Sequence, residues 1–174
     1  AEDTTGVGGA GLLYSNADKI VTSGGALTLR GDVIGRTTNA SAALKVASTS
    51  LNLNAGASGN GAVNVTSASA IQLDTLDTTG SGTVAITTSS GNIQLGDGSS
   101  TAIDNAGTGA MTITSAGNID VTAAFDHDGA ITLVSGADGS AGKIYGDSVI
   151  KSAGALTLRS DMIDDDGDSS DDAS

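Results

Sequence analysis

The chain has 174 residues, of which 26 are glycine, and it contains no proline, cysteine or tryptophan. Seven Lys and Arg residues stand against twenty Asp and Glu residues, which gives a formal net charge of -13 at pH 7. This composition excludes a disulfide framework, a cysteine zinc site and a thiol nucleophile, and the negative charge disfavours nucleic acid and anionic membranes as partners. No apolar run approaches the roughly 18 residues of a membrane-spanning helix, so no membrane insertion is expected.

Short units of the form apolar-x-apolar recur along the chain, and each is expected to be a strand with one buried face. In chain order these units occupy residues 27–29, 44–46, 51–53, 63–65, 71–73, 84–86, 93–95, 111–113, 119–121, 131–133 and 156–158. Because there is only one Phe and there are two Tyr, the core has to be aliphatic. The side chains expected to form its inward ladder are Leu27, Leu29, Val63, Val65, Ile71, Leu73, Ile93, Leu95, Ile119, Val121, Ile131, Leu133, Leu156 and Leu158.

The spacing of the units indicates how they are arranged. Alternate units begin at residues 44, 63, 84, 111 and 131, and the interleaved units begin at 51, 71, 93 and 119, so the period is near twenty. This period predicts an all-β, right-handed parallel β-solenoid (β-helix) with about 20 residues per coil and seven or eight coils. An antiparallel sandwich of the immunoglobulin type is the rival, and the scarcity of aromatics and the self-similarity of the units argue against it.

The solenoid is expected to span residues 1–163, and residues 164–174 are expected to be an Asp-rich tail or linker. A third side of each coil is also expected, because further apolar residues fall between the units. Its candidate contacts are Val33, Ile34, Leu76, Ile103, Phe125 and Ile144.

Two segments are much more alike than the other coils. Residues 20–34 read IVTSGGALTLRGDVI and residues 149–163 read VIKSAGALTLRSDMI, identical at nine of fifteen positions. One interpretation is the duplication of a favourable coil, and the other is that the two ends of the rod are built alike so that they can stack. Stacking would join unpaired strand edges head to tail and produce an open filament. The residues expected to lie at such ends are Leu27, Arg30, Leu156 and Arg159.

Acidic residues near the end of the sequence form a candidate calcium site. The carboxylates Asp161, Asp164, Asp166, Asp168 and Asp171 are hard oxygen ligands, which suit Ca²⁺. The spacing around Gly167 does not fit an EF-hand loop, so a solvated acidic tail is the favoured interpretation. Calcium is the one cofactor that the sequence suggests.

No catalytic residue is predicted. His127, the single histidine, lies between Asp126 and Asp128, and we expect it in a turn. Polysaccharide-acting β-helix enzymes need aromatic platforms and paired acids, and this chain has only three aromatics. Ice binding by a flat face of Thr-x-Thr pairs is disfavoured too, because only residues 112–114 fit that pattern cleanly. The other outward pairs are Asn52 and Asn54, Asn64 and Thr66, Gln72 and Asp74, and Asp120 and Thr122.

The recurring Gly-Ala-Leu-Thr-Leu unit carries a resemblance to a known class of protein. It occurs at residues 25–29 and 154–158, and close variants occur at 129–133 and 115–121. The chain resembles, over roughly residues 20–163, the repetitive β-helical regions of large bacterial exoproteins of the filamentous-haemagglutinin type. The resemblance implies a secreted protein at the bacterial cell surface, either a repeat segment of a longer chain or a short relative.

The expected function is therefore that of a non-enzymatic, extracellular structural protein. Its main partner would be itself, as a β-solenoid subunit that stacks head to tail into a cell-surface filament or matrix fibre. The first alternative is a calcium-dependent adhesin stalk or binding segment of a larger exoprotein, which recognises a host or surface glycan or protein through loops at 96–108 and 123–129. The remaining alternative is a polysaccharide-acting β-helix enzyme.

Overall fold

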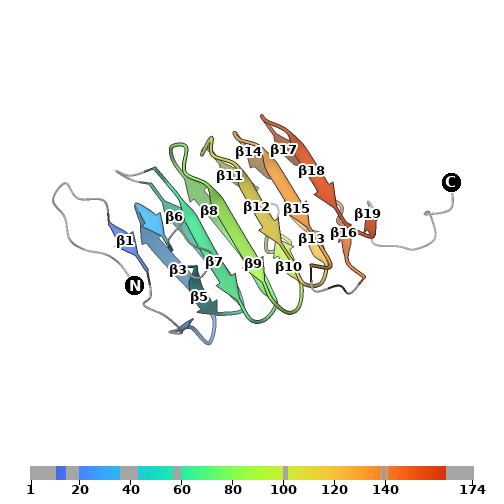
Figure 1. The fold of residues 1–174 in the computed structure, drawn as a ribbon, viewed down its shortest axis with the longest axis horizontal. Helices are drawn as coiled ribbons and strands as arrows, with labels where there is room; N and C mark the ends of the chain where they lie inside the picture. Colours follow the sequence, from blue (N-terminus) through green and yellow to red (C-terminus); the bar gives the residue numbers. More distant parts are fainter. Residues whose placement is uncertain are drawn as a thin grey trace.

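The computed structural model describes residues 11–14, 20–35, 43–56, 60–99, 102–137, 139 and 141–163. Within these residues the chain forms a parallel β-solenoid of about five turns, with about 24 residues per turn and no helix. Figure 1 shows the turns stacked side by side, from β1 and β3 at one end to β18 and β19 at the other. The parallel solenoid predicted from the period is confirmed, and the right-handed coil remains a prediction.

The expectation of seven or eight coils of about 20 residues is wrong. Each turn is longer, at about 24 residues, and there are about five turns. The reason is that turn length varies: residues paired in register are 20 positions apart between Met111 and Ile131, but 27 apart between Val84 and Met111 and 25 apart between Ile131 and Leu156.

Nineteen strands in the described residues pair in parallel and form three sheets. The nine-stranded sheet contains β1 (Leu12–Leu13), β2 (Ile20–Thr22), β4 (Val33–Ile34), β5 (Leu44–Ala47), β7 (Val63–Ser67), β9 (Val84–Thr88), β12 (Met111–Thr114), β15 (Ile131–Val134) and β18 (Leu156–Arg159). The seven-stranded sheet contains β3 (Ala26–Gly31), β6 (Ser50–Ala55), β8 (Ile71–Thr78), β10 (Ile93–Leu95), β13 (Ile119–Val121), β16 (Lys143–Tyr145) and β19 (Met162–Ile163). The three-stranded sheet contains β11 (Ile103–Asn105), β14 (Phe125–His127) and β17 (Ile150–Ser152).

Side chains at equivalent positions of successive turns stack to form the core. Ile93, for example, lies in register between Ile71 and Ile119. A single turn cannot bury its inward side chains, whereas a neighbouring turn about 4.8 Å away can cover them. Of the fourteen residues expected in the inward ladder, twelve are at most 8% exposed, while Leu156 is 44% exposed and Leu158 is partly exposed. The exposure of Leu156 departs from the expectation because β18 is the last strand of its sheet.

The third side of the solenoid differs between the two halves of the molecule. Ile103 and Phe125 lie on the three-stranded sheet, as expected, but Val33 and Ile34 belong to the nine-stranded sheet and Ile144 to the seven-stranded sheet. In the first half, β3, β6 and β8 are long strands. In the later turns, two short strands replace each long strand, one on the seven-stranded sheet and one on the three-stranded sheet. Leu76 lies in the second half of β8, which packs against β11.

Glycine is required where one turn passes close to the next. Gly61 has a φ of 70° and lies against the carbonyl of Thr79, and Gly35 has a φ of 74° and lies against the carbonyl of Asn64. A Cβ at either position would collide with that carbonyl, and the backbone conformation is one that favours glycine.

Candidate functional site

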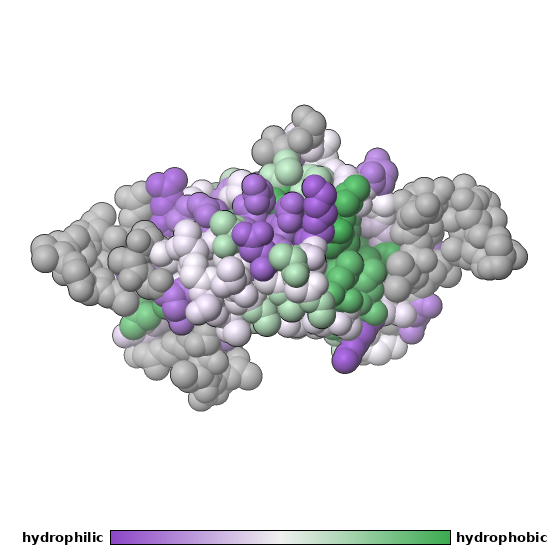
Figure 2. Space-filling model, turned by 90° about the horizontal axis from the view of Figure 1, so that it is seen from above, coloured by the Kyte–Doolittle hydropathy of each residue, from purple (hydrophilic) through white to green (hydrophobic). Residues whose placement is uncertain are grey.

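The large apolar side chains that remain exposed gather at the two ends of the solenoid. Among the described residues these are Leu12, Tyr14 and Ile20 in the first turn, and Val149 and Leu156 in the last, all between 44% and 59% exposed. Figure 2 shows a hydrophobic band near the C-terminal end of the rod, with hydrophilic residues beside it. Within the described part of the chain, the exposed large apolar side chains thus lie at the ends of a strongly acidic protein.

The two similar segments lie at these ends, on different sheets. In the first GALTLR segment (residues 20–34), the strand β3 belongs to the seven-stranded sheet, and Leu27 and Leu29 are 8% and 0% exposed. In the second GALTLR segment (residues 149–163), the strand β18 belongs to the nine-stranded sheet, and Leu156 is 44% exposed. Similar sequences therefore lie on different sheets and are buried to different extents.

Backbone from the start of the described chain covers the first GALTLR segment. The Gly11 carbonyl accepts hydrogen bonds from the Asp32 and Val33 amides at 2.8 and 3.2 Å, and the Leu13 carbonyl accepts one from the Gly35 amide at 2.7 Å. In return, the Gly11 amide donates to Asp32 Oδ2 at 2.6 Å, and Asp32 is only 6% exposed. Its equivalent in the second GALTLR segment, Asp161, is exposed. In the second segment the strand equivalent to β4 is β19, and β16 of the preceding turn pairs with it in the same register, so the two segments differ in the burial of Asp32 and Asp161 and not in the pairing of this strand.

The residues expected at the assembly ends are consequently at opposite ends of the rod. Leu27 and Arg30 lie on β3, and Leu156 and Arg159 lie on β18. Arg30 is exposed beside Asn54 and Asp77, where the Asn54 amide donates to Asp77 Oδ2 at 2.7 Å. Both arginines are exposed on the outer face and Leu27 is buried, so of these four residues only Leu156 belongs to the exposed apolar surface of an end.

The candidate calcium ligands fall mostly beyond the described residues. Asp161 is exposed just before β19, whereas Asp164, Asp166, Asp168 and Asp171 lie outside the described part of the chain. Within the described part, no three His, Asp or Glu side chains are grouped so that they could hold a metal ion.

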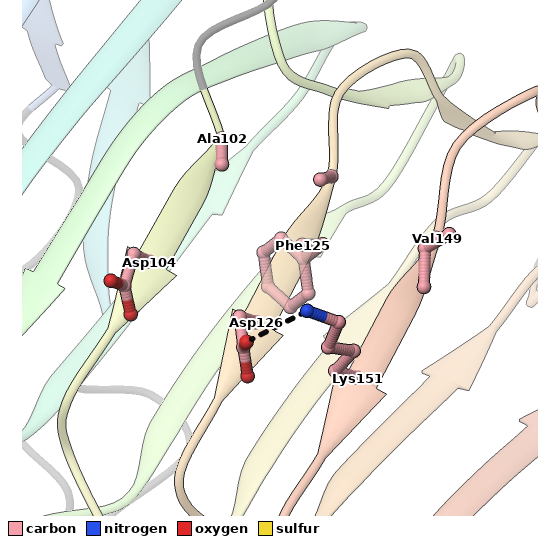
Figure 3. Close-up of a pocket in the computed structure, with 7 residues that line it drawn as sticks. Ala102, Asp104, Phe125, Asp126, Val149 and Lys151 are labelled. Carbon is pink, nitrogen blue, oxygen red and sulfur yellow. Dashed lines mark ion pairs between the residues drawn. The ribbon is translucent and has the colours of Figure 1, made fainter.

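A shallow hollow of about 100 Å³ lies on the outer face of the three-stranded sheet. Figure 3 shows Asp104, Asp126 and Lys151 on successive strands around Phe125, with Lys151 Nζ 3.7 Å from Asp126 Oδ2. Both partners of this ion pair are well exposed, so it contributes little to stability. The hollow is smaller than the cavities that usually hold small-molecule ligands, and its two carboxylates lie side by side on one face instead of flanking a groove.

His127 is a buried strand residue, so its expected place in a turn is wrong. It is 1% exposed and lies on β14, in register with Asn105 on β11. Asn105 Oδ1 accepts from the Thr78 amide at 2.6 Å, which directs Asn105 Nδ2 to donate to His127 Nδ1 at 2.9 Å. His127 Nε2 donates to the Gly109 carbonyl at 2.8 Å, so both ring nitrogens have hydrogen-bond partners. The chain of hydrogen bonds is complete, so it serves the fold.

The surroundings of Asp120 on the seven-stranded sheet disfavour the charged form of its carboxyl group. Burial, with a smaller effect from the charge of Asp147, raises the pKa of Asp120 above its ordinary value. Burial, together with the nearby charge of Asp120, also raises the pKa of Tyr145, which pairs with Asp120 in the ladder. Burial is the larger cause of both pKa shifts, and the neighbouring acidic side chains add to it.

No family model matches the chain, and neither the curated proteins nor the solved structures contain a match to it. The described residues include no helix that is long and apolar enough to cross a membrane.

Proposed function

We propose that this protein is a structural β-solenoid unit that joins end to end with further copies of itself into a filament. The resemblance of its repeats to bacterial exoproteins supports a place outside the cell, at the bacterial surface, and a role in a filament, stalk or matrix fibre. In this proposal the protein performs no catalysis.

The supporting observation is the pair of similar segments at the two ends. In the first GALTLR segment, Gly11 and Leu13 cover the backbone around Asp32 and Gly35. The second GALTLR segment offers the same residue types, with Leu156 and Asp161 exposed. The free edge of the second segment is that of β18, which pairs only with β15 among the described strands, and β2 at the other end of the rod pairs only with β5. The first turn of a second copy is therefore able to pair with β18, because an open strand edge accepts backbone hydrogen bonds from an added strand.

Burial of the exposed leucine and valine would favour such a joint. Val149 and Leu156 are 59% and 44% exposed, and covering an apolar side chain of this size contributes about 1.5 to 3 kcal/mol when burial becomes complete. The joint brings one end of the rod against the opposite end of the next copy. Such a head-to-tail contact forms no closed oligomer, so copies continue to add and form a fibre.

A calcium-dependent adhesin segment is the second candidate, favoured by the Asp-rich sequence after residue 163. Oxygen ligands of this kind would bind Ca²⁺, and a bound ion would stabilise the folded chain by an amount that grows with the logarithm of the Ca²⁺ concentration above its dissociation constant. The binding of a host or surface glycan or protein would then be the activity, and the solenoid would be its stalk.

Negative-stain electron microscopy of concentrated protein, with millimolar Ca²⁺ and with chelator, tests both candidates. We expect filaments for the wild type, short rods for Leu156→Asp, and filaments for the control Thr157→Asp, which places the same charge on the outer face of the same strand. Short rods for the wild type in both samples would contradict self-assembly and favour a segment of a longer solenoid. Filaments or a raised melting temperature only with Ca²⁺ would assign a calcium role to the Asp-rich sequence.

A further inference from the structure

The outer face of the nine-stranded sheet carries two columns of mostly threonine side chains. One column consists of Asn64, Ala85, Thr112, Thr132 and Thr157, and the other consists of Thr66, Thr87, Thr114, Val134 and Arg159; in both, successive members are paired in register. Figure 1 shows the strands that carry them, β7, β9, β12, β15 and β18, lying side by side on the face turned toward the viewer. Members of a column are about 4.8 Å apart, and the two columns are separated by about 6.7 Å.

The hydroxyl groups of this face are available to an outside partner. Thr66, Thr87, Thr112, Thr114, Thr132 and Thr157 are all partly or fully exposed, and within the described residues none of their side chains makes a hydrogen bond. Threonines elsewhere are often bonded: Thr75 donates to Asn52, Thr78 to Asn105 and Thr122 to the Leu95 carbonyl. Each free hydroxyl offers one donor and two acceptor positions.

Charge is absent from the centre of this face, although the protein as a whole is strongly acidic. The strands β7, β9, β12 and β15 contain no charged residue. The acids lie on the other two sheets, with Asp77 and Asp120 on the seven-stranded sheet and Asp126 on the three-stranded sheet. The face is therefore neutral, regular and lined by hydroxyl and methyl groups.

These properties do not suit a protein or a polysaccharide partner. Protein interfaces rely on aromatic, Arg and large apolar anchors, and the central strands of this face have no aromatic residue and no Arg. Sugar rings are usually held by aromatic platforms. A periodic neutral array of hydrogen-bonding groups fits a partner that is itself a periodic hydrogen-bonded lattice.

Ordered water provides such a lattice at a similar scale. With hydrogen-bonded oxygens about 2.75 Å apart in a tetrahedral network, second-neighbour oxygens are about 4.5 Å apart, and the network repeats at about 7.3 Å across its layers. The second-neighbour oxygen distance differs from the strand spacing by about 0.3 Å. Each column extends over five strands, which are four spacings, so the mismatch along a whole column is about 1.2 Å.

We infer that the threonine face of the nine-stranded sheet binds ice. The sequence argued against this because the outward pairs were considered together, whereas the structure separates them by face. Asn52 and Asn54, Gln72 and Asp74, and Asp120 lie on the seven-stranded sheet, and Thr122 follows its strand β13. Only Asn64, Thr66 and the residues at 112 and 114 belong to the threonine face.

The test measures the fraction of protein taken up by slowly growing ice, together with thermal hysteresis, for the wild type and matched variants. We expect uptake of the wild type, exclusion of Thr114→Lys, and uptake of the control Thr28→Lys, which places the same charge on the seven-stranded sheet. The double variant Ala85→Thr and Val134→Thr completes both columns and is expected to increase the hysteresis.

Circular dichroism establishes which variants fold. If Thr114→Lys does not fold, Thr114→Val keeps the side-chain shape and removes the hydroxyl, and reduced uptake is expected. Exclusion of the folded wild type from ice overturns the inference, as does equal uptake of the wild type and a folded Thr114 variant. Sedimentation with microcrystalline cellulose is measured in parallel, and binding to cellulose with exclusion from ice overturns the inference in favour of a polysaccharide.

Discussion

The two GALTLR segments are a natural comparison within one molecule, because nearly the same residues meet different surroundings. In the first segment Leu29 is fully buried and Asp32 is 6% exposed, whereas in the second segment Leu158 is partly exposed and Asp161 is exposed. Both segments form strands at nearly the same positions, but the regular alternation of buried and exposed residues along β3 is absent along β18. The repeat thus specifies a strand, while the neighbouring turn decides how deeply that strand is buried.

The largest difference between the segments is expected for the second leucine of each. Leu29→Ala leaves a cavity in a closed part of the core and is expected to lower the free energy of unfolding by about 2 to 5 kcal/mol. Leu158→Ala should cost less than half of this, since solvent already reaches the side chain. Urea denaturation of dilute protein measures both, and equal losses would contradict the comparison.

A loss of stability of intermediate size is expected when the buried pair of Asn105 and His127 is disrupted. This pair lies on the three-stranded sheet, which exists only in the later turns. His127→Ala removes the groups that Asn105 and the Gly109 carbonyl bond, and leaving buried polar groups unpaired costs about 1 to 3 kcal/mol. The control Asp128→Ala changes the exposed neighbour and should be nearly neutral. Thermal melting distinguishes the two, and equal melting temperatures would show that the hydrogen bonds of His127 do not support the fold.

The aspartates of the two segments should also differ. Asp32→Ala removes the acceptor of the Gly11 amide and is expected to destabilise the protein by about 1 to 2 kcal/mol. Asp161→Ala should change stability by less than about 0.5 kcal/mol, as at most exposed sites. Denaturant midpoints of dilute samples measure this, and a destabilising Asp161→Ala would indicate that the second segment is already covered in the monomer.

The smallest effect is expected at Asp120, an acid that is partly buried without compensation. Its pKa is raised in the folded protein above the ordinary 3.8, so the folded state holds the proton more tightly than the unfolded state. The resulting contribution to stability is present below about pH 3.8 and is lost as the pH rises through the folded-state pKa. Asp120→Asn should therefore raise the melting temperature at pH 7 and leave it nearly unchanged near pH 3. A lower melting temperature at pH 7 would contradict the direction of the pKa shift.

The sequence predicted the strands well because period-two alternation is a local property. Each of the eleven apolar-x-apolar units lies in a strand, and the two interleaved series correspond to the nine-stranded and seven-stranded sheets. The face taken by each GALTLR segment could not be predicted, because it depends on how many residues the intervening loops contain.

The buried pairing of Asn105 with His127 was missed for a similar reason. The sequence signal for this pair was that each polar residue lies two positions after an apolar residue, in Ile103-Asp104-Asn105 and Phe125-Asp126-His127. Polar residues at the end of such short units are, however, more common in turns. The exposure of Leu156 was also beyond the sequence pattern, which contains no information on whether a further turn covers the last strand.

Amide hydrogen exchange at β18, measured over a range of protein concentrations, is the most direct test of the proposed end-to-end joint. The amides of β18 that point away from β15 should exchange quickly in dilute protein and become protected as concentration rises, while the amides of β9 in the centre of the rod stay equally protected. Exchange at β18 that does not depend on concentration, under conditions where β9 remains protected, would contradict the account.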